Sequence, residues 1–585
     1  MSAIQQLITE HMDIWTAADT GKRSGRGRAS SNAGSVYGVK KLRELILELA
    51  VRGKLVPQDA NDEPASELVK RIQTEKVKLV AEGKIKKEKP LAPISEDDKP
   101  FELPLSWDWV HLPDISDYKV GKTPSTKISA YWTNSVGGYN WVSIADLNHD
   151  NYVFETNKQI TSKAVSEVFR CEPAPAGTIL MSFKLTLGKI SLLDAPAFHN
   201  EAIISIYPNQ AVFKEYLFKV LPARALDGDS KSAIKGNTLN SESIAALLIP
   251  LPPLAEQHRI ITKVDELMAL CDQLEAQHCN AVEAHEKLVN HLLGTLTQSQ
   301  RADDLSANWQ RIYAHFDVLF TTEASIDALK QTLLQLAVMG KLVPQDPKDE
   351  PASELLKRIQ AEKAKLIAEG KLKKEKPLAP IADDEKPFGL PNGWEWVRLS
   401  DASTYIQYGY TDSANQTNRE ILFLRITDIQ DDFVDWTSVP GCNSDLKQVQ
   451  DYLLSENDIV IARTGGTIGK SYLVKDLTVN SIFASYLIRI GKIENINHKF
   501  KKLYFGSQLY WNQLYANSMG TGQPNVNGTA LKGLVFSLPP IAEQQRIVAK
   551  VNALMALCDQ LKTRIQLANL QQQAIANALV AQAVA

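Results

Sequence analysis

The stretch LPPLAEQHRI at residues 251–260 returns later in the chain as LPPIAEQQRI at residues 538–547. The octapeptide LMALCDQL follows both copies at the same distance, at residues 267–274 and 554–561. We call this repeated stretch segment B. A repeat over a fixed displacement indicates a repeated structural unit, so it decides the architecture of the whole chain.

A second repeated stretch, segment A, precedes segment B in each half. GKLVP stands at residues 53–57 and 340–344, and EPASELVKRIQTEK from Glu63 returns as EPASELLKRIQAEK from Glu350 at the same displacement. The stretches between A and B barely resemble each other. The layout is a repeated frame with two unlike inserts. If the chain ends meet, they rebuild the B–A unit of the middle, which predicts an approximate two-fold axis.

Segment B is predicted to form long helices, because its apolar residues follow the four-three spacing of a heptad seam. A helix of about 40 residues spans roughly 60 Å, more than one DNA turn of about 34–36 Å. His278 and His285 lie on the first seam without a carboxylate or cysteine cluster, so we interpret them as seam residues rather than metal ligands. The seams consist of Ile260, Val264, Leu267, Cys271 and Leu274, and of Ile547, Val551, Leu554, Cys558 and Leu561.

Composition places the chain among ordinary globular proteins. Of 585 residues, 44% are hydrophobic and 23% charged, and the net charge is −3. A near-neutral charge implies that any contact with nucleic acid uses local Lys and Arg clusters, or that a partner supplies positive charge. No apolar run of membrane-spanning length and no secretory signal is seen. The five cysteines are scattered, which favours reduced thiols and a cytoplasmic protein.

The variable stretches mix short β-branched and aromatic runs with turn residues, typical of small α/β or mostly β domains. Gly465 to Ser471 resembles a phosphate-binding loop, but the glycine that the motif requires is replaced by Thr464, so the spacing fails. No other catalytic constellation and no dinucleotide fingerprint is found. We therefore expect no catalytic residue, no metal site and no cofactor in this chain.

The layout resembles the specificity subunit of type I restriction-modification enzymes over nearly the whole chain. The Leu-Pro-Pro-x-x-Glu-Gln-x-x-Ile element, present twice, is a specific signal. GKTPS at residues 121–125, Tyr131-Trp132 and WVSIAD at residues 141–146 are similar to the opening of many target-recognition domains. The second domain departs from that opening, with YGYT at residues 408–411 and RITDI at residues 425–429. This divergence indicates two unlike half-sites.

The resemblance implies that each variable domain reads one half of a split, asymmetric sequence in double-stranded DNA. Two modification subunits would dock on the helices, carry S-adenosylmethionine and methylate adenine N6, and restriction subunits would use ATP and Mg²⁺ for translocation and cleavage. This chain would recognise the DNA sequence and serve as the scaffold, without catalysis of its own and without contact with a membrane.

We therefore expect an α/β (α+β) protein: two globular target-recognition domains separated by long antiparallel coiled-coil helical spacers, with pseudo-two-fold symmetry. The expected parts are a conserved helical region at 1–112 with a flexible basic tail at 21–35, recognition domain 1 at 113–249, a central spacer at 250–399, recognition domain 2 at 400–536 and a C-terminal helix at 537–585.

Candidate DNA-contacting residues are polar or cationic side chains at strand ends and in loops, because base edges are read by polar groups and phosphates by Lys, Arg and backbone amides. In domain 1 they are Lys122, Thr123, Ser143, Asp146, Lys184, Lys189 and Asn237, and in domain 2 Tyr410, Arg425, Thr427, Arg463, Thr464, Lys470, Gln523 and Asn525.

Two other functions fit parts of the sequence. A coiled-coil adaptor whose variable domains bind proteins would suit the near-neutral charge. An NTPase or nuclease would need a catalytic cluster that the sequence does not display. DNA recognition is favoured, because a duplicated frame with divergent inserts has no obvious use in either alternative.

Overall fold

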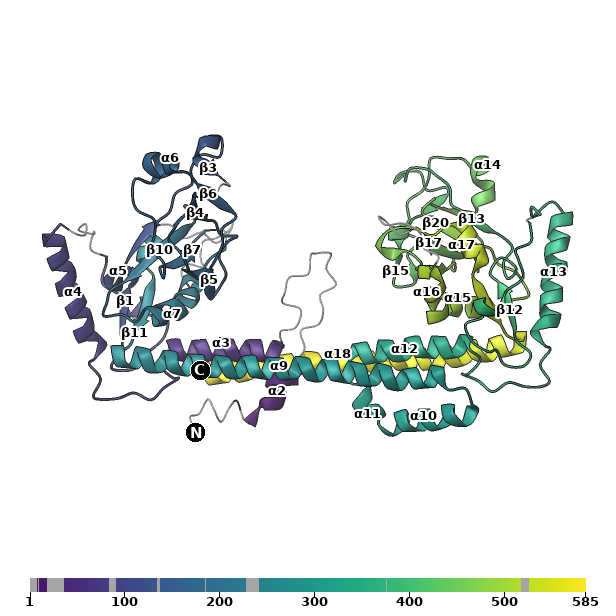
Figure 1. Ribbon diagram of the computed structural model, residues 1–585, viewed down its shortest axis with the longest axis horizontal. Coiled ribbons are helices and arrows are strands. Elements are labelled where there is room, and N and C mark those ends of the chain that lie inside the picture. Colours follow the sequence, from purple (N-terminus) through teal and green to yellow (C-terminus); the bar gives the residue numbers. More distant parts are fainter. Residues whose placement is uncertain are drawn as a thin grey trace. The chain divides into compact units, whose positions relative to one another are not determined.

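The computed structural model divides the chain into two compact units (Figure 1). Unit 1 comprises residues 1–280 and 569–585, and unit 2 comprises residues 281–568. The long helix α9 (Leu254–Gln298) begins in unit 1, and α18 (Ile541–Val584) begins in unit 2. The structure describes residues 8, 10–17, 36–83, 91–133, 137–184, 186–227, 241–374, 376–516 and 525–584.

Within the described residues, unit 1 combines helices with three sheets, of two, five and four strands. Its helices are α2 (Met12–Ala17), α3 (Tyr37–Val51), α4 (Ala65–Ala81), α5 (Leu112–Ile115), α6 (Ser162–Ala164), α7 (Lys214–Asp227) and α8 (Ser241–Ala245). Its strands are β1 (Asp108–His111), β2 (Ser116–Val120), β3 (Trp132–Thr133), β4 (Tyr139–Val142), β5 (Asn151–Val153), β6 (Lys158–Ile160), β7 (Ile179–Ser182), β8 (Ile190–Leu193), β9 (Ala197–His199), β10 (Ile203–Pro208) and β11 (Leu248–Leu251).

Unit 2 has a similar set of elements. Its helices are α10 (Ala302–Ala314), α11 (Phe316–Leu319), α12 (Glu323–Val338), α13 (Ala352–Ala368), α14 (Leu446–Val449), α15 (His498–Gly506), α16 (Gln508–Ala516) and α17 (Gly528–Gly533). Its strands are β12 (Glu395–Arg398), β13 (Ile406–Tyr408), β14 (Leu422–Leu424), β15 (Ile429–Gln430), β16 (Phe433–Val434), β17 (Ile459–Ala462), β18 (Ser471–Leu473), β19 (Ser481–Phe483), β20 (Leu487–Ile490) and β21 (Val535–Leu538).

An antiparallel two-stranded ribbon closes each variable domain where the chain enters and leaves it. In unit 1, β1 pairs with β11, with Asp108 opposite Leu251. In unit 2, β12 pairs with β21, with Glu395 opposite Leu538. The ribbon joins the end of segment A to the beginning of segment B, so each variable domain is tied to the frame at one neck.

The two variable domains share the order and pairing of their central strands although their sequences differ. The main sheet has the strand order β2-β10-β7-β8-β5 in unit 1 and β13-β20-β17-β18 in unit 2. Beside it, a parallel pair is formed by β4 with β9 and by β14 with β19. The hairpin β7–β8 corresponds in order and pairing to β17–β18. The divergent inserts are thus two versions of one fold.

The predicted heptad seam lies in the core of unit 1. Its five residues from Ile260 to Leu274 are buried and share one hydrophobic cluster with α3. Polar contacts border the seam: Arg43 of α3 pairs with Asp272 (2.7 Å) and Glu275 (2.8 Å). In unit 2, α12 takes the place of α3, and its Lys330 pairs with Asp559 of α18 at 2.6 Å.

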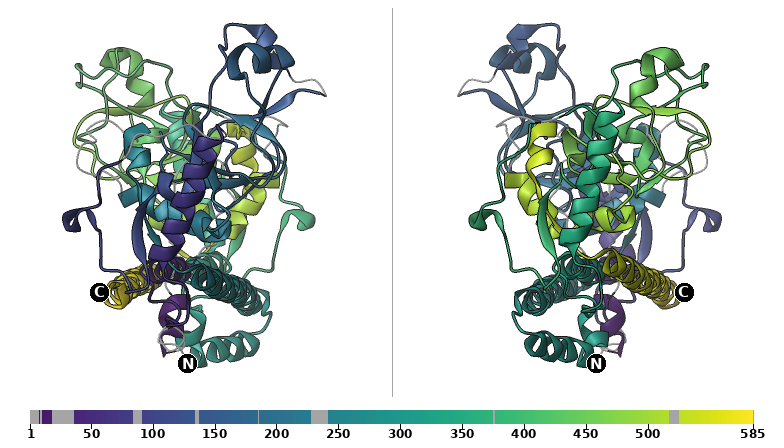
Figure 2. Two further views of the ribbon diagram at one scale, coloured as in Figure 1. Left: turned by 90° about the vertical axis from the view of Figure 1, so that its left-hand side faces the viewer. Right: turned by 90° about the vertical axis from the view of Figure 1, so that its right-hand side faces the viewer.

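Helix α4 lies on the outside of the first variable domain (Figure 2). Its Leu68 and Ile72 are buried, and Lys76 donates a hydrogen bond to the carbonyl of Pro113. The matching helix of unit 2, α13, makes the same contact, because Lys363 donates to the carbonyl of Ser400 at 2.7 Å. Segment A therefore holds its variable domain from the side as well as at the neck.

A buried carboxylate fixes the start of α9 to segment A. Glu256, only 1% exposed, accepts hydrogen bonds from Trp107 Nε1 (3.0 Å) and from Gln58 Nε2 (2.7 Å). Burial raises the pKa of Glu256, and the two hydrogen bonds act against that rise. One turn later, Arg259 forms a bidentate ion pair with Asp62, and the shorter of its two N–O distances is 2.6 Å. The repeated Glu and Arg of segment B therefore bind segment A.

The glutamine of the same motif binds the variable domain instead. Gln257 is fully buried. Its Nε2 donates to the carbonyl of Pro252 at 2.9 Å, and its Oε1 accepts from the backbone N–H of Phe213 at 2.8 Å. Adjacent residues at the start of α9 thus hold the frame and the insert together. Unit 2 repeats these contacts as Glu543 with Trp394 and Gln345, Gln544 with Pro539 and Asn497, and Arg546 with Asp349.

We predict that Glu256→Ala lowers the free energy of unfolding by about 1–3 kcal/mol, because the buried indole N–H of Trp107 loses its acceptor. The midpoint of urea unfolding, followed by tryptophan fluorescence, measures the loss. Glu266→Ala is the control: Glu266 lies on the same helix and pairs only at the surface, with Lys263 at 2.9 Å, which is worth at most about 1 kcal/mol. Equal shifts in both variants would contradict the assigned anchor.

Candidate nucleic-acid interface

A glycine opens the same loop in both variable domains by allowing close contact between backbones. A Cβ on Gly121 would lie 2.1 Å from the carbonyl oxygen of His199, and one on Gly409 would lie 2.1 Å from that of Ala484. The loop that follows is pinned in each case, because Lys122 N–H donates to the carbonyl of His199 (2.9 Å) and Tyr410 N–H to that of Phe483 (2.8 Å). Candidate residues of both domains therefore follow one fixed backbone feature.

Two tryptophans clamp the first of these loops. Trp141 Nε1 donates to the carbonyl of Lys122 at 3.0 Å, and Trp132 Nε1 donates to that of Ser125 at 3.3 Å. Their rings meet edge to face with centroids 5.0 Å apart. The aromatic residues of the opening motif thus shape the loop. Within it, Lys122 and Thr123 are exposed; the Lys122 ammonium donates to the Val168 carbonyl at 2.9 Å, and the Thr123 hydroxyl donates to the Glu201 carboxylate.

A capped turn after the parallel strand pair is the second shared feature. In unit 1, Asp146 accepts from the backbone N–H (2.8 Å) and the hydroxyl (2.6 Å) of Ser143, and from the backbone N–H of Asn157 (2.9 Å). It is 8% exposed. The carboxylate of Asp146, a candidate DNA contact, is thus buried and hydrogen-bonded within the loop, where it shapes the turn.

The equivalent turn in unit 2 carries a cation in place of the serine. Asp428 accepts from the backbone N–H of Arg425 at 2.8 Å and forms two further hydrogen bonds with its guanidinium, at 3.0 and 2.6 Å. The hydrogen bond with Asp428 raises the pKa of Arg425. Thr427, between them, is exposed. The candidates Ser143 and Arg425 therefore occupy matching positions, and Arg425 is held by its own turn.

The hairpin between β7 and β8 contains the other two candidate residues of unit 1 that the structure describes, Lys184 and Lys189. Lys189 is half-buried and donates to the carbonyl of Ile144 at 3.2 Å. Lys184 lies with its ammonium 5.1 Å from the centroid of the Phe183 ring. Asn237 lies outside the described residues. Lys189 thus joins the hairpin to the Ser143–Asp146 turn.

The matching hairpin of unit 2 brings three distant stretches of sequence together. The guanidinium of Arg463 lies 4.8 Å from the centroid of Tyr408, and its Nε donates to Asn525 Oδ1 at 3.4 Å. Thr464 pairs with Asn525 through a β-bridge. Lys470, at the far end of the hairpin, is exposed. Arg463, Thr464 and Asn525 therefore form one cluster, whereas Gln523 lies outside the described residues.

Tyr408 was missing from the sequence-based set although it belongs to this cluster. Its ring is 40% exposed, and its hydroxyl accepts from the backbone N–H of Gly528 at 2.7 Å. The sequence signal that could have identified Tyr408 is its position directly before Gly409, the glycine at the close backbone contact. Tyr410, which was in the set, is half-buried and packs on Tyr452 with centroids 5.0 Å apart.

The glycine-rich turn from Gly465 to Ser471 connects β17 to β18. A phosphate-binding loop of the NTPase type requires a helix after the turn, so that helical N–H groups face the phosphate. Here a strand follows instead, which argues against that function. No group of three or more potential metal ligands occurs within the part of the chain that the structure describes. None of the helices there combines the length and the apolar character that crossing a bilayer requires.

Comparison with known proteins identifies the class. The family model of the type I restriction modification DNA specificity domain matches twice, at residues 104–284 and 391–570. The EcoAI and EcoEI specificity subunits of type I restriction enzymes from Escherichia coli are each 40% identical, over 100% and 99% of both chains, respectively. The solved HsdS subunit from Thermoanaerobacter tengcongensis is 15% identical over 83% of this chain and 98% of that chain, with a TM-score of 0.38.

The two closed variable domains on a repeated frame are thus a pair of DNA-specificity domains. The chain belongs to the family of type I restriction-modification specificity subunits.

We predict that Arg463→Ala weakens DNA binding of the assembled complex roughly tenfold or more, because a hydrogen bond from a charged donor contributes about 1.5–3 kcal/mol. A gel shift with the partner subunits present measures the affinity. Arg311→Ala removes an equally charged, exposed side chain from α10, outside the variable domain, and serves as the control. Unchanged affinity and unchanged sequence preference in Arg463→Ala would exclude Arg463 from the interface.

Asp146→Ala is expected to act on stability. Its removal leaves the N–H groups of Ser143 and Asn157 without their acceptor, which costs about 1–3 kcal/mol. Thermal unfolding of Asp146→Ala should therefore shift to lower temperature, while Asp117→Ala, at an exposed position of β2, should not. An altered sequence preference at unchanged stability would instead indicate that Asp146 contacts DNA.

Proposed function

We propose that this chain reads a bipartite, asymmetric sequence in double-stranded DNA, one half-site with each variable domain, and that it performs no catalysis itself. The observation that carries the proposal is the presence of unlike side chains on one shared backbone plan. After the matching glycines stand Lys122 in one domain and Tyr410 in the other, and the matching turns begin with Ser143 and Arg425. Different donors at equivalent places suit different bases.

We further propose that the long helices act as an antiparallel coiled-coil spacer with pseudo-two-fold symmetry. Helix α9 has 45 residues and α18 has 44, so each is about 66–68 Å long. This length exceeds the 34–36 Å of one DNA turn. The length of these helices would then set the number of unread base pairs between the half-sites.

The partners proposed here are two modification subunits and restriction subunits. Apolar side chains on α18 that are left exposed support docking on this helix, since burying them against a partner would remove apolar surface from water. S-adenosylmethionine for methylation of adenine N6, and ATP with Mg²⁺ for restriction, would reside on the partners, in the cytoplasm. The exposed apolar residues of α18 are Leu557, Leu567, Leu570 and Ile575.

The proposed spacer is tested by inserting seven residues of helix into α9 between Asn280 and Ala281 and into α18 between Ala568 and Asn569. Seven residues preserve the heptad phase and add about 10 Å. Because a base pair occupies about 3.4 Å, the gap between the half-sites should grow by about three base pairs. Sequencing the methylated positions in DNA from cells that carry the whole system measures both half-sites and the gap.

The matched control inserts seven residues after Ala314, between α10 and α11, which lengthens neither long helix. This control should retain the original gap. A gap that stays constant in the variant with longer helices would refute the spacer, whereas methylation without any two-part sequence would refute the proposed function itself.

A further inference from the structure

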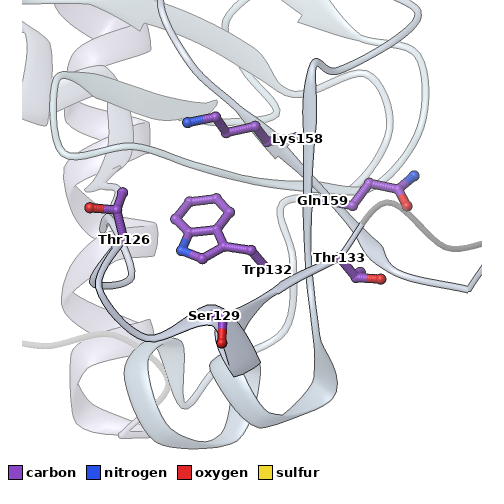
Figure 3. Close-up of a pocket in the computed structure, with 6 residues that line it drawn as sticks. All are labelled: Thr126, Ser129, Trp132, Thr133, Lys158 and Gln159. Carbon is purple, nitrogen blue, oxygen red and sulfur yellow. The ribbon is translucent and has the colours of Figure 1, made fainter.

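A hollow of about 440 Å³ lies in the first variable domain, at a pair of strands beside the loop that the tryptophans clamp. Strands β3 and β6 are antiparallel, with Thr133 opposite Gln159. They continue the sheet β3-β6-β4-β9 beyond the parallel pair. The residues that line the hollow are Thr126, Ser129, Trp132, Thr133, Lys158 and Gln159 (Figure 3).

The lining combines a cation, hydroxyl groups and an aromatic surface, without a carboxylate. The Lys158 ammonium lies 5.4 Å from the centroid of the Trp132 ring. Thr126 and Ser129 lie on other sides of that ring (Figure 3), and both are exposed, as is Lys158. A ligand that suits this lining carries negative charge on one part and an apolar surface on another.

The aromatic wall is fixed before any ligand arrives. Trp132 donates its indole N–H to the carbonyl of Ser125 at 3.3 Å and packs edge to face on Trp141. Gln159 donates to Asn140 Oδ1 at 3.3 Å, so its amide is engaged on the sheet. A preorganised wall lowers the entropic cost of binding.

Within the described residues, the corresponding sheet of unit 2 contains the pair β14 and β19 alone. Four of the six lining residues lie on β3 and β6, the strands that this pair lacks. A ligand held in the hollow would therefore strengthen the binding of one half-site and leave the other unaffected.

We propose that the hollow binds one deoxyribose-phosphate unit of the DNA backbone next to the half-site that the first domain reads. Lys158 and the Thr126 hydroxyl would hold the phosphate, while the sugar packs against Trp132. The inference rests on the proposed function. An extruded base fits less well, because stacking on this ring face would displace the Lys158 ammonium.

The proposal is tested with Lys158→Gln, which keeps a polar side chain of similar reach and removes the charge. The assembled complex with its modification subunits is titrated with target and non-target duplexes at several salt concentrations. Loss of one phosphate contact should make the slope of log K against log salt shallower by about 0.9, which amounts to about eightfold in affinity at 0.1 M salt. Both duplexes should lose affinity by the same factor.

The control is Lys214→Gln, which removes a half-exposed lysine of the same domain that does not line the hollow. Duplexes with a single neutral methylphosphonate then locate the contact. One phosphate near the first half-site should matter to the wild-type complex and lose its effect in Lys158→Gln, and none near the second half-site should behave in this way.

The possible outcomes distinguish a failure of the proposed function from a failure of the phosphate site. A wild-type complex that does not prefer its target duplex would overturn the proposed function. A wild-type complex that does, together with a Lys158→Gln variant of unchanged affinity and salt slope, would overturn the phosphate site alone. A variant that loses affinity for the target but not for other duplexes would also overturn it, because Lys158 would then read a base.

Discussion

The pair of adjacent buried polar residues at the start of each long helix is the contact on which the rest depends. Glu256 holds the tryptophan and glutamine of segment A, while Gln257 holds the backbone of the variable domain. Neither side chain reaches solvent, and a buried polar group is costly unless its partners are in place. Helix, frame and insert are therefore joined at one point in each unit, in addition to the contacts at the neck and along α4 or α13.

This arrangement separates what must stay constant from what can change. Two backbone features recur in both variable domains: the close approach at Gly121 and Gly409, and the turn capped by Asp146 or Asp428. Each fixes the direction of a loop through backbone atoms and a carboxylate. The side chains that follow are then free to differ without disturbing the fold, so a change of recognised sequence requires no change in the frame.

The frame was predictable from sequence because its signals are local and repeated: heptad spacing marked the buried seam. The candidate nucleic-acid interface was less predictable from the sequence. The candidates Ser143 and Arg425 come from sequences that look unrelated, yet they occupy the same capped turn, and the burial of Asp146 in that turn is visible only in the structure. The cluster of Tyr408, Arg463 and Asn525 joins three distant stretches, and no local pattern announces such a contact.

The ion pairs of the frame bear on how this chain attracts DNA. Several cations of the frame are paired with carboxylates, as in Arg259 with Asp62, Arg546 with Asp349 and Lys562 with Asp327. These pairs offer little net attraction to a phosphate backbone, in keeping with the overall charge of −3. We therefore expect cations in the loops of the variable domains and positive charge on partner subunits to contribute to the attraction. On this basis we expect the chain alone to bind DNA weakly and the assembled complex to bind it firmly.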